Sequence, residues 1–153
     1  MFNLGGMYAT GRGVAQNDAQ AVAWFRKAAD NGDAGGMTYL GQMYLQGRGV
    51  SKDDAQAIVW FRKGAENGFP DGMSNLGWMY MQGRGVAQDD TEAVAWYRKA
   101  AEKGNPAGIN WLGVMYEQGR GVVRDTAEAL TWYRKAAALG SEEAKTNLKR
   151  LGQ

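Results

Sequence analysis

The chain has 153 residues, of which 44% are hydrophobic and 22% charged, and its formal net charge is +2. It contains neither cysteine nor histidine, which excludes disulfides, thiolate nucleophiles, imidazole bases and zinc sites built on these residues. No apolar run is long enough for a membrane span or a signal-peptide core, and so weak a positive charge predicts no nucleic-acid partner.

The letters Gly-Arg-Gly-Val recur every 36 residues, beginning at Gly11, Gly47, Gly83 and Gly119. Leucines, methionine–tyrosine pairs and tryptophans recur along the chain at the same 36-residue interval. A fixed period of this size predicts a repeat array in which one supersecondary unit stacks on copies of itself. We therefore expect a single repeat domain over 1–153, with a truncated repeat at 1–33, full repeats at 34–69, 70–105 and 106–141, and a capping helix at 142–151.

Each repeat is predicted to be a pair of helices. In the second repeat, small and apolar residues from Gly36 to Tyr44 follow helical spacing and predict a first helix, helix A, over about 34–46. Gly47 and Gly49 supply the positive φ needed at the helix end and in the turn that follows. The turn has neither the third glycine of a dinucleotide fingerprint nor the Gly-Lys-Ser/Thr of a phosphate loop.

The second helix of each repeat, helix B, begins at a predicted capping box. The four boxes are Asn17 with Gln20, Asp53 with Gln56, Asp89 with Glu92, and Asp125 with Glu128. Glycines end helix B at 32, 68, 104 and 140, and Pro70 and Pro106 open the next helix A. Gly41, Gly77 and Gly113 lie inside helix A, where glycine costs about 1 kcal/mol, so we expect each to form a notch for an aromatic ring of helix B.

The phased motif Leu40-Gly41-x-Met43-Tyr44, the Gly47-x-Gly49 turn and Trp60-Phe61 in helix B resemble the Sel-1-like repeats, relatives of the tetratricopeptide repeats. The resemblance covers nearly the whole chain. It implies an all-α, right-handed αα superhelix that serves as a scaffold or adaptor for protein–protein interaction, common in bacteria and often associated with the envelope. A periplasmic, envelope-associated or cytoplasmic location is consistent with it.

The chain departs from the family pattern in two respects. Some secreted members carry a disulfide in every repeat and are associated with penicillin binding or hydrolysis, and the absence of cysteine gives that branch no support here. Glycine replaces the family's common alanine at Gly36, Gly72 and Gly108, which we expect to alter the spacing between helices slightly.

In the related tetratricopeptide fold, variable positions of helix A line a concave groove. When these positions are assigned in each repeat of this chain by the 36-residue period, they predict a groove for a protein or peptide partner. The predicted lining consists of Thr38, Gln42, Leu45, Gln46, Ser74, Trp78, Met81, Gln82, Asn110, Val114, Glu117 and Gln118. The first repeat contributes Phe2, Gly6, Ala9 and Thr10. Trp78 and Met81 are the expected apolar anchor of a partner, although Trp78 could instead fill space against an adjacent helix. Tyr39 and Trp111 are expected to point along the stack.

The turn arginines are predicted to form a ladder along one edge, made of Arg12, Arg48, Arg84 and Arg120. Such a ladder could bind a polyanion, or could consist of solvated side chains balanced by the acids Asp53, Asp54, Asp89 and Asp90. Serine occurs only at Ser51, Ser74 and Ser141, and no histidine is available as a base, so we expect no catalytic site, no metal site and no cofactor.

The two ends of the array differ. Residues 141–151 read as a polar capping helix, whereas Phe2 and Leu4 belong to a helix A whose outer face nothing covers. We therefore expect fraying or self-association through the N-terminal end. A binding scaffold is the favoured function. The alternatives are a carbohydrate or cell-wall binding module that uses Trp78 and Trp111 as sugar platforms, and an idealised array without a natural ligand.

Overall fold

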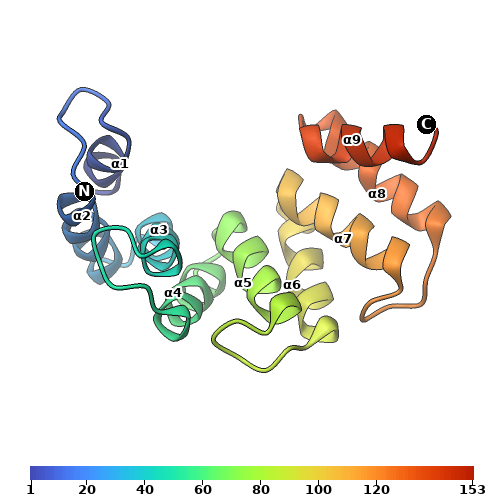
Figure 1. Ribbon diagram of the computed structural model, residues 1–153, viewed down its shortest axis with the longest axis horizontal. Coiled ribbons are helices and arrows are strands. Elements are labelled where there is room, and N and C mark those ends of the chain that lie inside the picture. The colour runs from blue at the N-terminus through green and yellow to red at the C-terminus, as the bar shows by residue number, and fades with distance from the viewer. The chain divides into compact units, whose positions relative to one another are not determined.

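The computed structural model describes all residues, 1–153, and consists of nine α-helices without a strand (Figure 1). The A helices are α1 (Phe2–Thr10), α3 (Ala34–Gln46), α5 (Pro70–Gln82) and α7 (Pro106–Gln118). The B helices are α2 (Asp18–Asp30), α4 (Asp54–Glu66), α6 (Asp90–Glu102) and α8 (Thr126–Ala138), and α9 (Glu142–Arg150) follows them. The predicted all-α class, with four helix pairs and a C-terminal helix, is confirmed.

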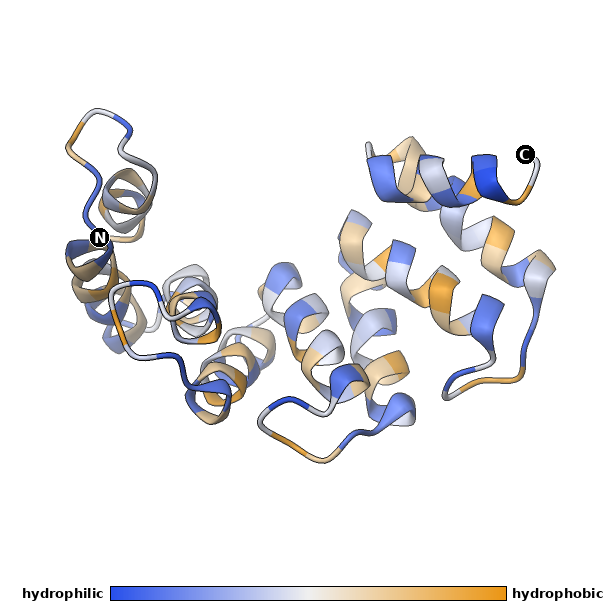
Figure 2. Ribbon diagram, in the orientation of Figure 1, coloured by the Kyte–Doolittle hydropathy of each residue, from blue (hydrophilic) through white to orange (hydrophobic).

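The chain forms two compact units, which are described separately. Unit 1 comprises Met1–Gly72 together with the turn Arg84–Val86, and unit 2 comprises Met73–Gly83 together with Ala87–Gln153. Hydrophobic and hydrophilic residues alternate within every helix, and no helix is uniformly apolar (Figure 2). Each helix therefore needs a neighbour to cover its apolar side. No helix is long and apolar enough to cross a membrane.

Helix B begins at the predicted N-cap, but only half of the predicted capping box is present. The carboxylate of Asp53 accepts from the backbone N–H of Gln56 at 3.0 Å. The backbone N–H of Asp53 donates to the carbonyl of Tyr44, also at 3.0 Å, and not to the Gln56 side chain. Asn17, Asp89 and Asp125 repeat both contacts. The last turn of helix A thus supplies the acceptor, in place of the Gln or Glu side chain that a full capping box would use.

The glycine notches are confirmed within both units. A Cβ placed on Gly41 would lie 2.9 Å from Cδ1 of Phe61 in α4, and one on Gly113 would lie 2.7 Å from Cε1 of Tyr133 in α8. Phe61 and Tyr133 are fully buried. The ring that fills the notch therefore belongs to the Phe or Tyr that follows the repeated tryptophan, while Trp24, Trp60 and Trp132 remain half-buried.

Within each unit, the two successive repeats share a core. In unit 1, Ala21, Val22 and Phe25 of α2 are buried in the same cluster as Leu40 and Met43 of α3. The ring of Tyr39 lies 5.4 Å from Phe25 between ring centroids. In unit 2, Trp111 stacks on Tyr97 at 6.2 Å with an interplanar angle of 13°. Tyr39 and Trp111 thus contact the preceding repeat, as predicted from their phase.

Helix α9 closes unit 2. Ala144 of this helix is buried, and the Asn147 side-chain amide donates to Asn110 of α7 at 3.0 Å. Arg150 donates to the Glu117 carboxylate at 2.7 Å. The capping helix predicted at 142–151 ends one residue earlier, at Arg150.

Candidate functional site

The twelve predicted groove residues differ in burial, and four of them lie in the interior. Thr38, Ser74, Met81 and Asn110 are all less than a tenth exposed. Gln42, Leu45, Trp78, Val114 and Glu117 are half-buried, while Gln46, Gln82 and Gln118 are exposed. Of the first-repeat positions, Phe2, Gly6 and Ala9 are half-buried and Thr10 is exposed.

Each buried member of the set has a partner within its own unit, contrary to the expectation that it faces a groove. The Thr38 hydroxyl donates to the carbonyl of Ala34 at 3.0 Å, and its oxygen occupies the space beside Gly64. Ser74 donates to the Asn105 side-chain oxygen at 2.7 Å. The hydroxyls of both residues are thus satisfied by hydrogen bonds inside the protein and do not face a groove.

Met81 was predicted to anchor a partner together with Trp78, yet it is only 2% exposed. The Tyr97 hydroxyl donates to its sulfur at 3.9 Å, and its carbonyl accepts from Arg120 at 2.9 Å. Burial raises the pKa of Tyr97 far above its ordinary value, so this hydroxyl stays protonated. Met81 is therefore a core residue of unit 2, and of the predicted pair only Trp78 reaches the surface.

Glu117 is also committed to a contact inside unit 2. Its carboxylate accepts from Arg150 at 2.7 Å and from the Tyr133 hydroxyl at 2.6 Å. The hydrogen bond from Arg150 is the main cause that lowers the pKa of Glu117, and that from Tyr133 adds to it. Other repeats have Leu45 and Met81 at this position. Glutamate at this position of the fourth repeat therefore forms an ion pair with Arg150 of the polar capping helix.

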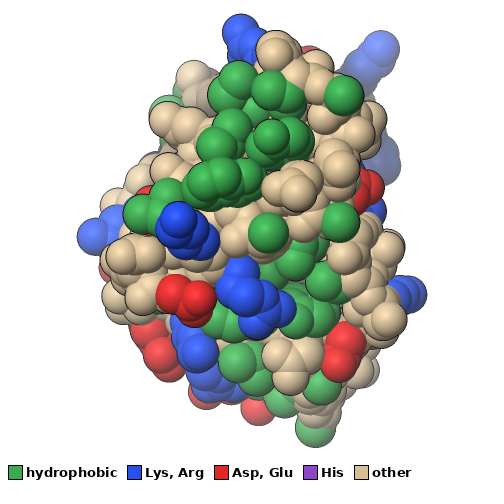
Figure 3. Space-filling model, turned by 90° about the vertical axis from the view of Figure 1, so that its left-hand side faces the viewer, with side chains coloured by type: hydrophobic (Ala, Val, Ile, Leu, Met, Phe, Trp, Pro, Cys, Tyr) green, Lys and Arg blue, Asp and Glu red, His purple; other side chains and the backbone are tan.

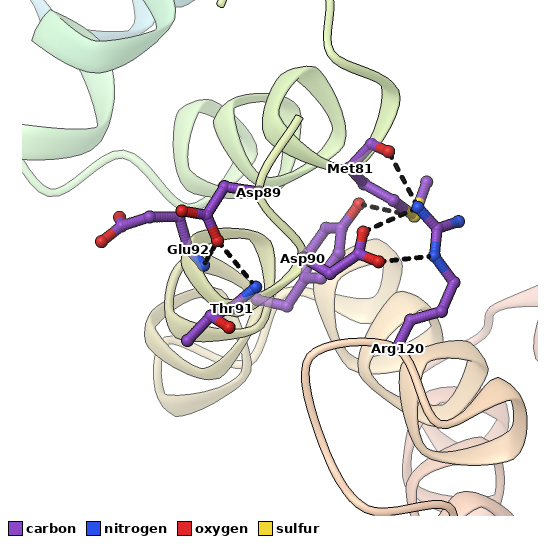
Figure 4. Close-up of polar contacts among 7 residues, drawn as sticks. Met81, Asp89, Asp90, Thr91, Glu92 and Arg120 are labelled. Atoms are coloured by element: carbon purple, nitrogen blue, oxygen red, sulfur yellow. Dashed lines mark hydrogen bonds and ion pairs between the residues drawn. The ribbon is translucent and has the colours of Figure 1, made fainter. Parts of the chain in front are cut away.

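Three of the four ladder arginines form a contact that we call the turn clamp. It joins the arginine of the turn after helix A to the first-turn aspartate of the preceding helix B, 30 residues earlier in the chain. The pairs are Arg48 with Asp18, Arg84 with Asp54, and Arg120 with Asp90. Each uses two nitrogen–oxygen contacts, and for Arg120 the distances are 3.0 and 2.7 Å (Figure 4). Bidentate geometry of this kind adds specificity to the ion pair.

The turn clamp also uses the backbone. Arg48 donates to the carbonyl of Ala9, at the end of the preceding helix A, at 2.7 Å. Gly49 has φ +68° and lies against the carbonyl of Asp18, where a side chain would collide with backbone atoms. The arginine hydrogen bonds lower the pKa of both Asp18 and Asp54. The Gly-Arg-Gly turn is therefore a connector between repeats.

The turn clamp could have been read from the sequence only in part. Of the four acids proposed as balancing charges, Asp54 and Asp90 pair with turn arginines, whereas Asp53 and Asp89 are N-caps. Aspartate recurs in phase at 18, 54 and 90 and is replaced by Thr126 in the fourth repeat. The side chain of Arg12 is exposed and forms no turn clamp within residues 1–153.

A hollow in unit 2 contains an aromatic side chain and polar groups. It has a volume of about 340 Å³ and is lined at the start of α7 and around the turn before α9, among others by Asn110, Trp111, Ser141 and Glu143. No group of three or more Asp or Glu side chains is placed to hold a metal ion.

Comparison with known proteins identifies the repeats. The model of the Sel1 repeat matches four segments, 1–33, 34–69, 70–105 and 106–141. No curated protein matches the chain. Among solved structures, a protective antigen present in uropathogenic Escherichia coli strains, which displays an SLR fold, is 44% identical with a TM-score of 0.87. That match covers 96% of this chain and 32% of the antigen.

Two further structures are similar. A Sel1 repeat protein from Oxalobacter formigenes is 38% identical with a TM-score of 0.90, over 99% of this chain and 63% of that protein. The cysteine-rich protein B of Helicobacter pylori is 27% identical with a TM-score of 0.65, over 83% of this chain and 91% of that protein. The chain spans about a third of the E. coli antigen and under two thirds of the Oxalobacter protein. The four matched repeats, which together account for residues 1–141, show that this chain belongs to the Sel1 repeat family.

Proposed function

We propose that this chain is a binding scaffold that holds a segment of a partner protein against the exposed face of its A helices. Sel1 repeat proteins are in general scaffolds for protein interaction, and the family is generally non-enzymatic. The finer proposal concerns which residues contact the partner. It rests on the half-buried and exposed members of the predicted groove set, because the buried members cannot be reached.

One observation carries the proposal. Gln42, Trp78 and Val114 occupy the same position of three successive repeats, and all three are half-buried. Leucine is kept from repeat to repeat at one fully buried position, as Leu40 and Leu112 show at zero exposure. By contrast, the chemistry of the solvent-accessible position changes in each copy, from an amide to an indole to an isopropyl group. Such positions are suited to specific contacts with a partner.

Within unit 2, Trp78 is the strongest candidate for a contact that dominates binding. Its large side chain is partly accessible, and tryptophan is enriched among residues whose truncation costs 2 kcal/mol or more at interfaces. Gln82 and Gln118, both exposed, lie one turn further along their A helices and would supply hydrogen bonds. Within unit 1, Gln42, Leu45 and Gln46 offer the corresponding mixture of apolar and amide groups.

The test is a pull-down with this chain as bait, followed by calorimetry on the purified partner. Trp78→Ala should weaken the partner's affinity more than about tenfold. Trp24→Ala is the matched control, because Trp24 is also half-buried but lies on helix α2. Equal affinity of the Trp78→Ala variant and the wild type, with both folded by circular dichroism, would refute the assignment of this face.

A carbohydrate-binding module is the second candidate, and the hollow in unit 2 favours it. Trp111 is half-buried there, its ring is held parallel to Tyr97, and carboxylate, hydroxyl and amide groups line the same space. An aromatic face beside polar groups is suited to a sugar ring. Soluble glycan fragments should then shift the tryptophan fluorescence, and Trp111→Ala should abolish the shift while leaving a protein partner bound.

A further inference from the structure

The hollow at the start of α7 contains one charged side chain, the Glu143 carboxylate, and neither lysine nor arginine lines it. Elsewhere charges of both signs meet: acidic and basic side chains lie interspersed on the side of the molecule shown in Figure 3. In the same helix turn as Glu143, Glu142 pairs with Lys145 at 2.7 Å. Glu143 is exposed and has no ion pair, and its carboxylate accepts only from the Ser141 hydroxyl, at 3.1 Å. The hollow therefore presents an unpaired negative charge.

The aromatic ring in the hollow is also without a cation. In all four B helices a lysine lies over the ring of the tryptophan three residues before it, as Lys63 does over Trp60 at 4.3 Å. The residue three places after Trp111 is Val114, and no cation of the chain lies over the Trp111 ring. This ring stacks on Tyr97, is half-buried and lines the hollow. An aromatic face of this kind attracts a cation within about 6 Å of the ring centroid.

A buried hydrogen-bond donor lines the same hollow. Asn110 is only 6% exposed, and its side-chain oxygen accepts from Asn147 at 3.0 Å. Its side-chain nitrogen, in contrast, donates to no group of the protein. Because a nearly buried N–H without an acceptor is costly, this nitrogen is suited to an acceptor that a ligand brings. Pro106 and Ala107 add apolar surface. The hollow thus offers one ligand a carboxylate, an aromatic face and a free donor.

We propose that this hollow receives a basic side chain, lysine or arginine, of the partner segment; the assignment rests on the scaffold function proposed above and specifies its partner. The cationic end of the side chain pairs with the Glu143 carboxylate, and its apolar stem lies over the Trp111 ring. A backbone carbonyl of the same segment accepts from the Asn110 side-chain nitrogen.

Charge favours this occupant over the sugar considered above. A neutral sugar uses the aromatic face but leaves Glu143 without a counter-charge, and an acidic side chain is repelled by it. The helix dipole favours a carboxylate in the first turn of α9, which accounts for Glu142 and Glu143 alike. It does not account for the bare aromatic face and the free donor, which lie in the hollow beside Glu143.

The probe for the test is N-acetyl-alanyl-arginyl-alanine amide, and its neutral counterpart has citrulline in place of arginine. Citrulline keeps the stem and the planar end of arginine but has no charge. Binding to the whole 153-residue chain is followed by NMR shifts of the backbone amides and the indole N–H groups. We expect saturable shifts at residues 105–111 and 140–144, the Trp111 indole included, with an affinity in the millimolar range. The citrulline peptide should bind roughly threefold to tenfold more weakly, and a lysine peptide should exceed its norleucine counterpart in the same way.

Two neighbouring substitutions test the carboxylate. Glu143→Gln should weaken the arginine peptide by roughly threefold to tenfold and leave the citrulline peptide unchanged. Glu142→Gln is the matched control, because it removes the same charge from an exposed residue of the same helix turn whose carboxylate already pairs with Lys145. It should change the affinity of the arginine peptide by less than about twofold.

Absence of shifts at millimolar arginine peptide, equal affinity of the arginine and citrulline peptides, or an affinity unchanged by Glu143→Gln would overturn the proposal. Tighter binding of glucosamine than of the arginine peptide, dependent on Glu143, would also overturn it, since the cation would then belong to a carbohydrate. Trp78→Ala tests the scaffold function separately. If Trp78→Ala weakens the captured partner and Glu143→Gln does not, only the assignment of the hollow fails. If Glu143→Gln weakens the arginine peptide and Trp78→Ala leaves the partner bound, the cation site stands and the assignment of the A-helix face fails.

Discussion

Two adjacent glycines of helix α1 provide a direct test of how the helix pairs are packed. Gly5 and Gly6 are both interior to the helix. A Cβ on Gly5 would lie 2.6 Å from Cδ1 and 2.7 Å from Cε1 of Phe25, whereas a Cβ on Gly6 would have no atom within 4 Å. The two positions share their backbone conformation and their helix, so Gly5→Ala and Gly6→Ala differ only in what the new methyl group meets.

The expected magnitudes follow from two opposing effects. Either substitution gains about 0.5–1 kcal/mol, because alanine restricts the unfolded backbone more than glycine does. Gly6→Ala should retain this gain. In Gly5→Ala the Phe25 ring must move, yet it is fully buried and its centroid lies 6.0 Å from that of Phe2 and 5.4 Å from that of Tyr39. Overpacking of this kind costs about 1–3 kcal/mol.

We therefore expect Gly6→Ala to unfold at higher urea concentration than the wild type, and Gly5→Ala to be less stable than Gly6→Ala by about 1–3 kcal/mol. Because repeat arrays can unfold in parts, urea titrations by circular dichroism should be paired with hydrogen exchange of the α1 and α2 amides. Equal stability of the two variants would refute the notch as the reason for the repeated glycine. Gly113→Ala, whose Cβ would lie 2.7 Å from the Tyr133 ring, should repeat the loss in unit 2.

Three further outcomes are expected. Asp54→Asn should lower the free energy of unfolding by about 1 kcal/mol, since it breaks the bidentate pair with Arg84, and urea titrations at low and high salt should show a smaller loss at high salt. The arginine partners lower the pKa values of Asp18, Asp54 and Glu117. The three ion pairs therefore contribute fully to the free energy of unfolding above the unfolded-state pKa of about 4, and this contribution is lost as pH falls through the lower folded-state values. The free energy of unfolding should be level above about pH 5 and fall below about pH 4, and a level profile down to pH 2 would contradict the assignment. Arg150→Ala should speed hydrogen exchange in α9 while leaving unit 1 unchanged, because it removes the ion pair that holds α9 to Glu117.

The local features of the fold were predictable because they depend on residues close together in the chain. Asp53 accepts from an amide three residues later, and Gly47 ends α3 with a positive φ of 69°. The limits predicted for helix A, about 34–46, match α3. Helix caps and turns of this kind are governed by backbone geometry and by side chains within one turn of the helix, so a single sequence contains the information.

The candidate site was predictable only in outline. Aligning the repeats by their 36-residue period identified the A-helix positions that vary. The alignment could not distinguish Trp78, which is half-buried, from Met81, which is 2% exposed. Both vary between repeats and both are apolar. The distinction depends on the Tyr97 hydroxyl, 16 residues away, which approaches the Met81 sulfur only once α5 and α6 are packed. Hydrophobicity and spacing alone do not report such a contact.

The sequence by itself determined the repeat, the approximate helix limits, the N-cap residues of the B helices and the membership of each residue in helix A or helix B. Only the tertiary structure decided which side chains join one repeat to the next. Arg48 and Asp18 are separated by 30 residues, and nothing local to either indicates their contact. Their pairing depends on the packing of α3 against α2, where the turn of one repeat meets the first turn of the helix before it. Contacts between distant residues follow from this packing.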